Sequence, residues 1–167
     1  MIWAAAIAIV CWFGNSAAGQ SIPGTEPNEH VQWHEGFAGR FKAGDTNVPM
    51  LAMSWYAGGT EFCTVERSGK VVTLFLGFSA AGSPGHLLDT TNRLLLTETI
   101  NTLPSQPNVS VPPGSQILVS GIRSNQWFRF AYDRSDVPKE VRKLYEITGA
   151  RLDEAQKPQG KSVAPIK

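Results

Sequence analysis

The segment from Glu29 to Glu35, EHVQWHE, has the residue types and the spacing of a metal site. His30 and His34 are four residues apart, so a helix would place both imidazoles on one face, with the two glutamates as further ligands. A zinc-protease motif also needs a glutamate directly after the first histidine, where this chain has Val31. Because the segment belongs to a stretch rich in glycine, proline and polar residues, we expect two surface histidines, no metal and no cofactor.

A second candidate chemistry is nucleophilic catalysis by Cys63 with His86 as its base. Cys63 lies in a β-prone run, whereas reactive thiols favour helix N-termini or exposed loops near positive charge. We therefore expect a buried, inert thiol. Ser83 lies near His86, but the G-x-S-x-G pattern of a nucleophile elbow is missing from the sequence. A small hydrolase that uses Cys63 or the His30/His34 pair stays as an alternative hypothesis.

Length and charge exclude further classes. A chain of 167 residues has the length of one domain and can bury a substantial core. Its formal net charge is +1, whereas a nucleic-acid-binding protein needs a basic surface to neutralise phosphates. We therefore expect no nucleic acid among its partners.

The first 19 residues resemble a signal peptide. Ile2 to Phe13 form an apolar run of the length of a signal-peptide core, too short to span a bilayer, and small residues at 16–19 suit a signal peptidase. We expect cleavage, export to the periplasm or the medium, and no membrane contact afterwards. Cys63 is then the one remaining cysteine, so no intrachain disulfide forms. The alternative is a structural envelope component held by an uncleaved N-terminal segment.

Short β-prone runs separated by glycine-containing turns, typical of an antiparallel meander, cover residues 50–56, 61–66 and 71–78. The pattern then changes to helical spacing over residues 86–103; a long pair of strands is the competing interpretation. The residues that share the predicted apolar face are Leu87, Leu88, Thr91, Leu94, Leu95 and Leu103. A loop with four prolines covers residues 104–115. Two further β-prone runs, 116–122 and 127–132, predict a hairpin.

Residues 127–147, WFRFAYDRSDVPKEVRKLYEI, are predicted to form the second strand of this hairpin followed by a helix. Phe128, Phe130 and Tyr132 alternate onto one face of the strand, where we expect core rather than a binding platform. Pro138 suits the first position of a helix. The residues of this helix that share its apolar face are Val137, Val141, Leu144 and Tyr145.

These elements predict a single α+β domain over residues 48–149. We expect an antiparallel sheet of four to five strands with two helices on one face. A loosely ordered, flexible arm over residues 20–47, with one short helical turn around 27–35, precedes the domain. A disordered tail over residues 150–167 follows it.

The order of these elements resembles that of the emfourin-type inhibitors of thermolysin-like metalloproteases and of similar small exported bacterial domains. The resemblance covers about Met50 to Thr148 and rests on two motifs. One is a glycine pair after the first strand, Gly58-Gly59, and the other is P-x-x-[VL]-x-x-L in the last helix, formed by Pro138, Val141 and Leu144. It implies an α+β fold and inhibition of a metalloprotease.

The sequence thus predicts an exported, non-enzymatic interaction domain whose partner is another protein, with a secreted protease as the specific case. A protease inhibitor presents a rigid exposed loop, and prolines lower the cost of ordering such a loop on binding. The alternative for the proline-rich loop is a plain connector. The candidate binding residues lie in two loops: Ala57, Gly58, Gly59, Thr60, Pro107, Pro112 and Pro113.

Overall fold

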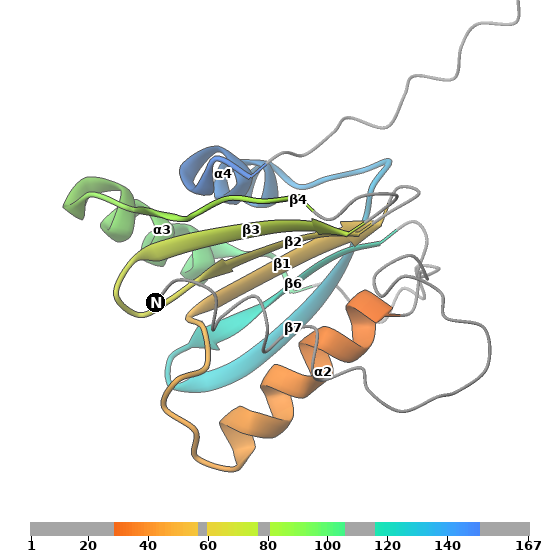
Figure 1. Cartoon of the computed structure of the whole chain (residues 1–167). Helices are drawn as coiled ribbons and strands as arrows, with labels where there is room; N and C mark the ends of the chain where they lie inside the picture. Colours follow the sequence, from red (N-terminus) through yellow and green to blue (C-terminus); the bar gives the residue numbers. More distant parts are fainter. Residues whose placement is uncertain (1–28, 57–59, 77–80, 106–115, 151–167) are drawn as a thin grey trace, which may run out of the picture.

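The computed structural model describes residues 29–56, 60–76, 81–105 and 116–150 (Figure 1). Within these residues the chain forms three helices and seven strands. In chain order they are α2 (Glu29–Lys42), β1 (Leu51–Tyr56), β2 (Thr60–Val65), β3 (Lys70–Leu76), β4 (Ala81–Gly82), β5 (His86–Leu87), α3 (Thr90–Thr102), β6 (Gln116–Arg123), β7 (Gln126–Asp133) and α4 (Lys139–Thr148).

The strands form one antiparallel sheet in the order β4-β3-β2-β1-β6-β7, with β5 also paired to β3. The predicted α+β class is confirmed. The strand number exceeds the four to five expected, because two short strands were not predicted. β4 lies among the glycines and proline of residues 79–85, and β5 lies at the start of the segment 86–103 that was predicted to be helical. Strand β1 is central: Met53 pairs with Cys63 of β2 on one side and with Val119 of β6 on the other.

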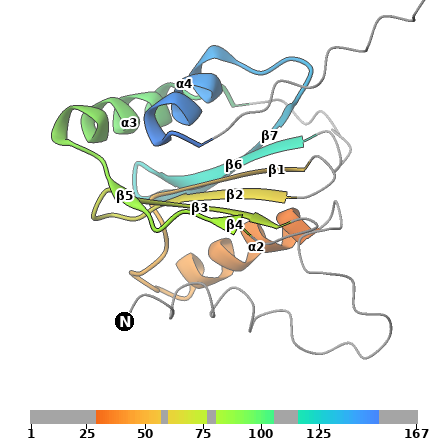
Figure 2. The same cartoon turned by 45° about the horizontal axis from the view of Figure 1, so that its top comes forward.

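The sheet lies between two helical layers (Figure 2). Helices α3 and α4 contact each other on one face, as predicted, and α2 covers the other face by contacts with β1, β6 and β7. The prediction of a loosely ordered arm is therefore wrong for residues 29–42, which form a 14-residue helix. The side of α2 that lies on the sheet carries histidines and aromatic residues rather than leucines, so the sequence shows no typical apolar stripe there.

The main core fills the space between the sheet and the α3–α4 layer. Alternate residues of β1 point into it, so that Leu51, Met53 and Trp55 are all buried. Burial of one such side chain stabilises the fold by about 1.5–3 kcal/mol relative to leaving it in water. The helices contribute Leu96, Ile100, Val141, Leu144 and Tyr145.

The C-terminal half of the fold follows its prediction closely. Strands β6 and β7 form the expected hairpin, whose turn residues Ser124 and Asn125 both have positive φ, as a tight two-residue hairpin turn requires. Tyr132 and Phe128 are buried in the core, as expected. Pro138 is the N-cap of α4, one position before the predicted first turn.

Helix α3 buries a stripe that differs in part from the one predicted. Leu88 and Leu103, which flank the helix, are buried as expected, but Leu87 and Thr91 are exposed. Leu94 is 69% exposed, whereas Leu96, Thr99 and Ile100 face the core. Asp89 caps the start of the helix: its carboxylate accepts a hydrogen bond from the backbone N–H of Asn92 at 2.7 Å. None of the described helices is long and apolar enough to cross a membrane.

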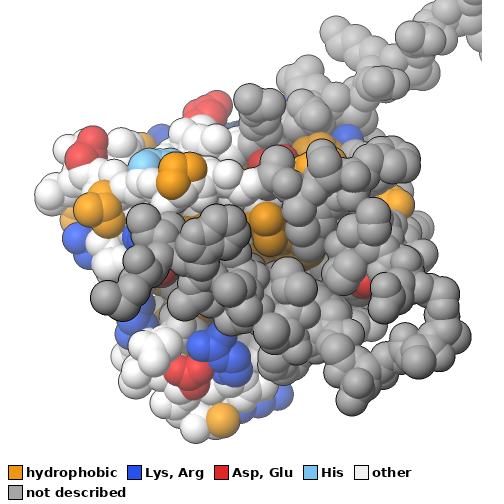
Figure 3. Space-filling model, viewed as in Figure 1, with side chains coloured by type: hydrophobic (Ala, Val, Ile, Leu, Met, Phe, Trp, Pro, Cys, Tyr) orange, Lys and Arg blue, Asp and Glu red, His pale blue; other side chains and the backbone are white. Residues whose placement is uncertain are grey.

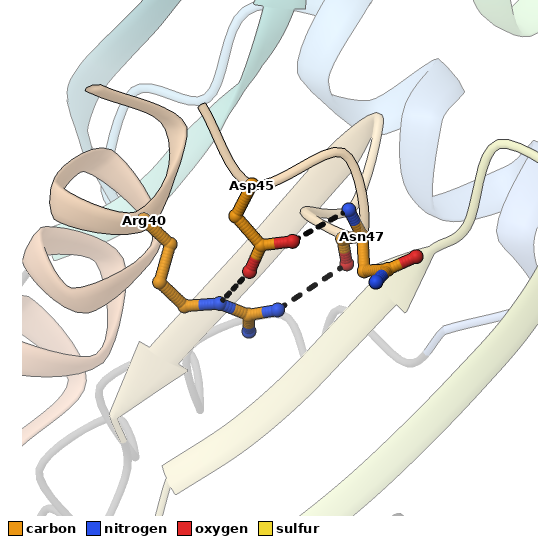
Figure 4. A network of polar contacts seen from close by, with 3 residues as sticks. All are labelled: Arg40, Asp45 and Asn47. Carbon is orange, nitrogen blue, oxygen red and sulfur yellow. Dashed lines mark hydrogen bonds and ion pairs between the residues drawn. The ribbon is translucent and has the colours of Figure 1, made fainter. Parts of the chain in front are cut away.

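A polar network fixes the path from α2 into β1 (Figure 4). The Asp45 carboxylate accepts hydrogen bonds from Arg40 Nε at 2.7 Å and from the backbone N–H of Asn47 at 2.8 Å. Arg40 lies in the last turn of α2, where a cation also suits the helix dipole. These hydrogen bonds connect the turn after α2 to the last turn of the helix.

Candidate functional site

The candidate metal pair, His30 and His34, lies inside the protein. Helix α2 does place His30 and His34 on one face, but that face lies against the sheet, and both side chains are 0% exposed. The expectation of two surface histidines is therefore wrong. Its physical reason is that residues 29–42 form a helix packed on the sheet, which leaves the histidine stripe no access to solvent.

Two serines from adjacent strands meet these histidines. Ser54 of β1 pairs with Leu118 of β6, and Ser120 of β6 pairs with Ala52 of β1, so the two serines are diagonal neighbours on the face toward α2. The Oγ atom of Ser120 is 2.5 Å from His34 Nδ1. The Oγ atom of Ser54 is 2.9 Å from His34 Nε2 and 3.1 Å from His30 Nδ1. We call these four residues the histidine–serine cluster.

The histidine–serine cluster can be satisfied without any net charge. A neutral imidazole donates through one nitrogen and accepts at the other, and a hydroxyl can donate one hydrogen bond while accepting another. Donation from His30 to Ser54, from Ser54 to His34 and from His34 to Ser120 uses each group once, and the reverse direction works equally well. Burial is the main cause that lowers the pKa of His34 well below 6.5, and the nearby His30 and Arg129 lower it further.

Aromatic rings pack beside the cluster and along α2. The Trp33 ring meets the His34 ring edge-on, with 4.9 Å between centroids, and also contacts Phe37 and Phe62. At the other end of the helix, Trp127 of β7 lies against Phe37 and Phe41. Packing of this kind holds α2 on the sheet.

This arrangement stabilises the fold and does not suit catalysis or metal binding. A nucleophilic serine must reach its substrate, yet Ser54 is 1% exposed and Ser120 is 0% exposed. Both nitrogens of His34 already face hydroxyl groups. In the described part of the chain, no group of three or more histidine, cysteine, aspartate or glutamate residues is placed to hold a metal ion.

The second candidate pair, Cys63 and His86, is not brought together. Cys63 lies in β2, paired with Thr73, and is 2% exposed. His86 lies in β5, two strands away, and is exposed at the edge of the sheet. Burial raises the pKa of the Cys63 thiol to about 12, with a smaller contribution from the charge of Glu61. The structure thus agrees with a buried thiol.

Of the predicted loop residues, only one falls among those the structure describes. Thr60 begins β2 and is 0% exposed, so its side chain lies inside the protein. Ala57, Gly58, Gly59, Pro107, Pro112 and Pro113 lie outside the described residues.

A surface feature that the sequence did not indicate lies beside α3. It is an open hollow with a volume of about 430 Å³, which we call the Arg67–Arg93 hollow after its two arginines. It is lined by residues from four segments far apart in the sequence, so no local pattern could have revealed it. Hydrophobic and basic side chains lie next to each other on the surface at this end of the molecule (Figure 3). The lining residues are Met50, Arg67, Thr90, Arg93, Leu94, Thr97 and Ile122.

Comparison with known proteins supplies no function for this chain. No protein-family model matches it, and no curated protein or solved structure matches it significantly. The resemblance to emfourin-type inhibitors, carried by Gly58-Gly59 and the Pro138 motif, accordingly stays a prediction.

Proposed function

We propose that this chain is an exported, non-enzymatic interaction domain that binds another protein, with a secreted thermolysin-like protease as the specific partner class. The observation that supports this most is that the candidate catalytic and metal-binding side chains are buried in the fold. His30, His34 and Cys63 are buried, and the polar atoms of the two histidines meet groups of the protein itself.

Exposed apolar side chains at one end of the molecule also favour an interaction surface. Leu87 of β5 is 71% exposed and Leu94 of α3 is 69% exposed, and the Arg67–Arg93 hollow adjoins Leu94. An exposed leucine alone is common, but apolar residues grouped around a charged hollow are typical of binding surfaces.

Titration of the purified chain against secreted proteases tests the proposal. The panel would include a thermolysin-like metalloprotease, a subtilisin-like serine protease and a papain-like cysteine protease. Residual protease activity and the integrity of the added chain are followed together. We expect stoichiometric inhibition of one class with the chain left uncut.

Two results would count against the protease role. Cleavage of the chain without inhibition would make it a substrate, and full activity of every protease at a large excess of the chain would remove the partner class. A heat-unfolded sample serves as the control, since inhibition by a folded surface must be lost with the fold.

A further inference from the structure

We propose that the Arg67–Arg93 hollow binds a short acidic segment of a partner protein, in which a carboxylate lies beside an apolar side chain. The proposal rests on the proposed function in so far as the partner is taken to be a protein. It is carried by the charge, the apolar floor and the rigidity of the hollow.

The charge comes from two guanidinium groups that reach the hollow from different elements. Arg67 lies in the turn between β2 and β3, and Arg93 lies in the first half of α3. Within the described residues neither forms an ion pair with a carboxylate. Arginine presents its donors in a planar fork that matches a carboxylate, so two such groups around one hollow favour an anionic ligand.

The Arg93 side chain is held in place before any ligand arrives. Its Nη2 atom donates a hydrogen bond to the Arg67 carbonyl oxygen at 3.3 Å. Its methylene groups lie against Gly69, where a Cβ atom would come within 2.9 Å of Arg93 Cδ. Because the Arg93 side chain is already ordered, less conformational entropy is lost when a ligand binds, and this favours affinity.

The floor of the hollow is apolar and rigid. Met50 lies directly before β1, and Ile122 lies near the end of β6. The Met50 N–H donates to the Val65 carbonyl at 2.9 Å. The Ile122 N–H donates to the Met50 carbonyl at 3.0 Å. Together with Leu94 these residues offer an apolar surface directly beside the two arginines.

The shape of the hollow suits a chain segment. Its volume of about 430 Å³ lies within the range of ligand sites, roughly 300–1,000 Å³. Leu94 lines it while being 69% exposed, so the hollow is open to solvent rather than enclosed. An extended segment can pass across it and place an acidic residue at the arginines and an apolar one on Met50, Ile122 and Leu94.

Two blocked tetrapeptides test this proposal by NMR titration of the full chain. The probe is acetyl-Asp-Leu-Glu-Leu-amide, and its neutral partner is acetyl-Asn-Leu-Gln-Leu-amide. We expect the acidic peptide to shift the backbone amides of Thr90, Thr97 and Ile122. The neutral peptide, the acidic peptide at high salt and the Arg67→Gln/Arg93→Gln variant should each show at least about fivefold weaker binding.

Lys143→Gln is the matched control, because it removes one positive charge from an exposed position of α4 outside the hollow. It should leave the affinity unchanged. The amide spectrum of each variant without peptide reports whether the fold is intact. Arg67→Gln alone, on an exposed turn, provides a second variant in case loss of Arg93 disturbs α3.

Several results would overturn the proposal. They are equal binding of the neutral peptide, equal binding by the double variant, or no shift at the hollow with any peptide. Sodium decanoate is tested in parallel: if it shifts the same amides with greater affinity, the hollow is a site for small amphiphiles and the protein-segment proposal fails. Peptide binding without protease inhibition would contradict the protease role alone, and inhibition without peptide binding would contradict this hollow alone.

Discussion

His34 of α2 hydrogen-bonds to Ser120 of β6, 86 residues further along the chain, and to Ser54 of β1, 20 residues further along. One buried imidazole thereby joins a helix to two neighbouring strands. The histidines that the sequence offers as a candidate metal site thus hold helix α2 on the sheet.

Removal of the His34 imidazole should destabilise the protein strongly. His34→Ala leaves a cavity under α2 and two buried serines without one hydrogen-bond partner each. We expect a loss of about 2–4 kcal/mol in the free energy of unfolding, measured by urea denaturation. Gln32→Ala, an exposed change on the same helix, should stay within about 0.5 kcal/mol of the parent protein. Similar losses in both variants would contradict the role of the cluster.

Stability should fall as the solution becomes acidic. The pKa of His34 in the folded protein lies well below 6.5, the ordinary value that it regains on unfolding. Below about pH 6.5 the His34 side chain is protonated in the unfolded chain but stays neutral in the folded protein. The free energy of unfolding therefore decreases as the pH falls from 6.5 toward the pKa of His34 in the folded protein. The slope reaches about 1.4 kcal/mol per pH unit for one such histidine.

Urea denaturation at pH 7.5, 6.5 and 5.5 measures this slope. His34→Gln should be less stable at pH 7.5 but should show a shallower pH dependence over this range. His86→Gln, at an exposed position on β5, should keep the parent slope. An unchanged slope in His34→Gln would assign the pH dependence to other groups.

The Cys63 thiol should be inert in the folded protein. Its burial and its pKa of about 12 leave little thiolate at neutral pH. We expect alkylation by iodoacetamide at pH 7.5 to be at least about a hundredfold slower in the native protein than in denaturing urea. Mass spectrometry of the Cys63 peptide separates this reaction from that of Cys11. Rapid native modification would instead revive the hydrolase hypothesis.

Two glycine substitutions should have opposite effects. A Cβ atom at Gly121 of β6 would collide with the Met50 carbonyl oxygen, which lies in the backbone that pairs with it. Gly121→Ala should therefore lower the free energy of unfolding by at least about 2 kcal/mol. Gly39 of α2 has open space around it, so Gly39→Ala should raise stability by about 0.5–1 kcal/mol. Thermal denaturation of both variants measures the difference.

The sequence predicts the sheet and its flanking helices well where the patterns are local. Alternation identifies the core face of β7 from Phe128 to Tyr132, and the apolar spacing of Val141, Leu144 and Tyr145 identifies the buried face of α4. Both signals depend on neighbours within one element.

The α2 helix and the histidine–serine cluster were beyond such reasoning. The buried stripe of α2 consists of His30 and His34, which are common surface residues, and their partners Ser54 and Ser120 come from strands otherwise rich in apolar residues. Only the tertiary contact makes these four polar residues mutually satisfied. The buried face of α3 was not predicted for a related reason: Leu94 and Leu96 are both leucines, and the pattern within the helix does not show which of them faces the core.

The most direct test of the structural role of the cluster is an NMR titration of the histidine side chains in the folded protein. We predict that the His34 imidazole stays neutral as the pH falls through 6.5 and becomes protonated only well below that value, together with loss of the folded amide spectrum. Reversible protonation of His34 near pH 6.5 in an otherwise unchanged protein would show a solvent-accessible imidazole. That result would contradict the buried cluster and make His34 a candidate metal-binding or catalytic residue again.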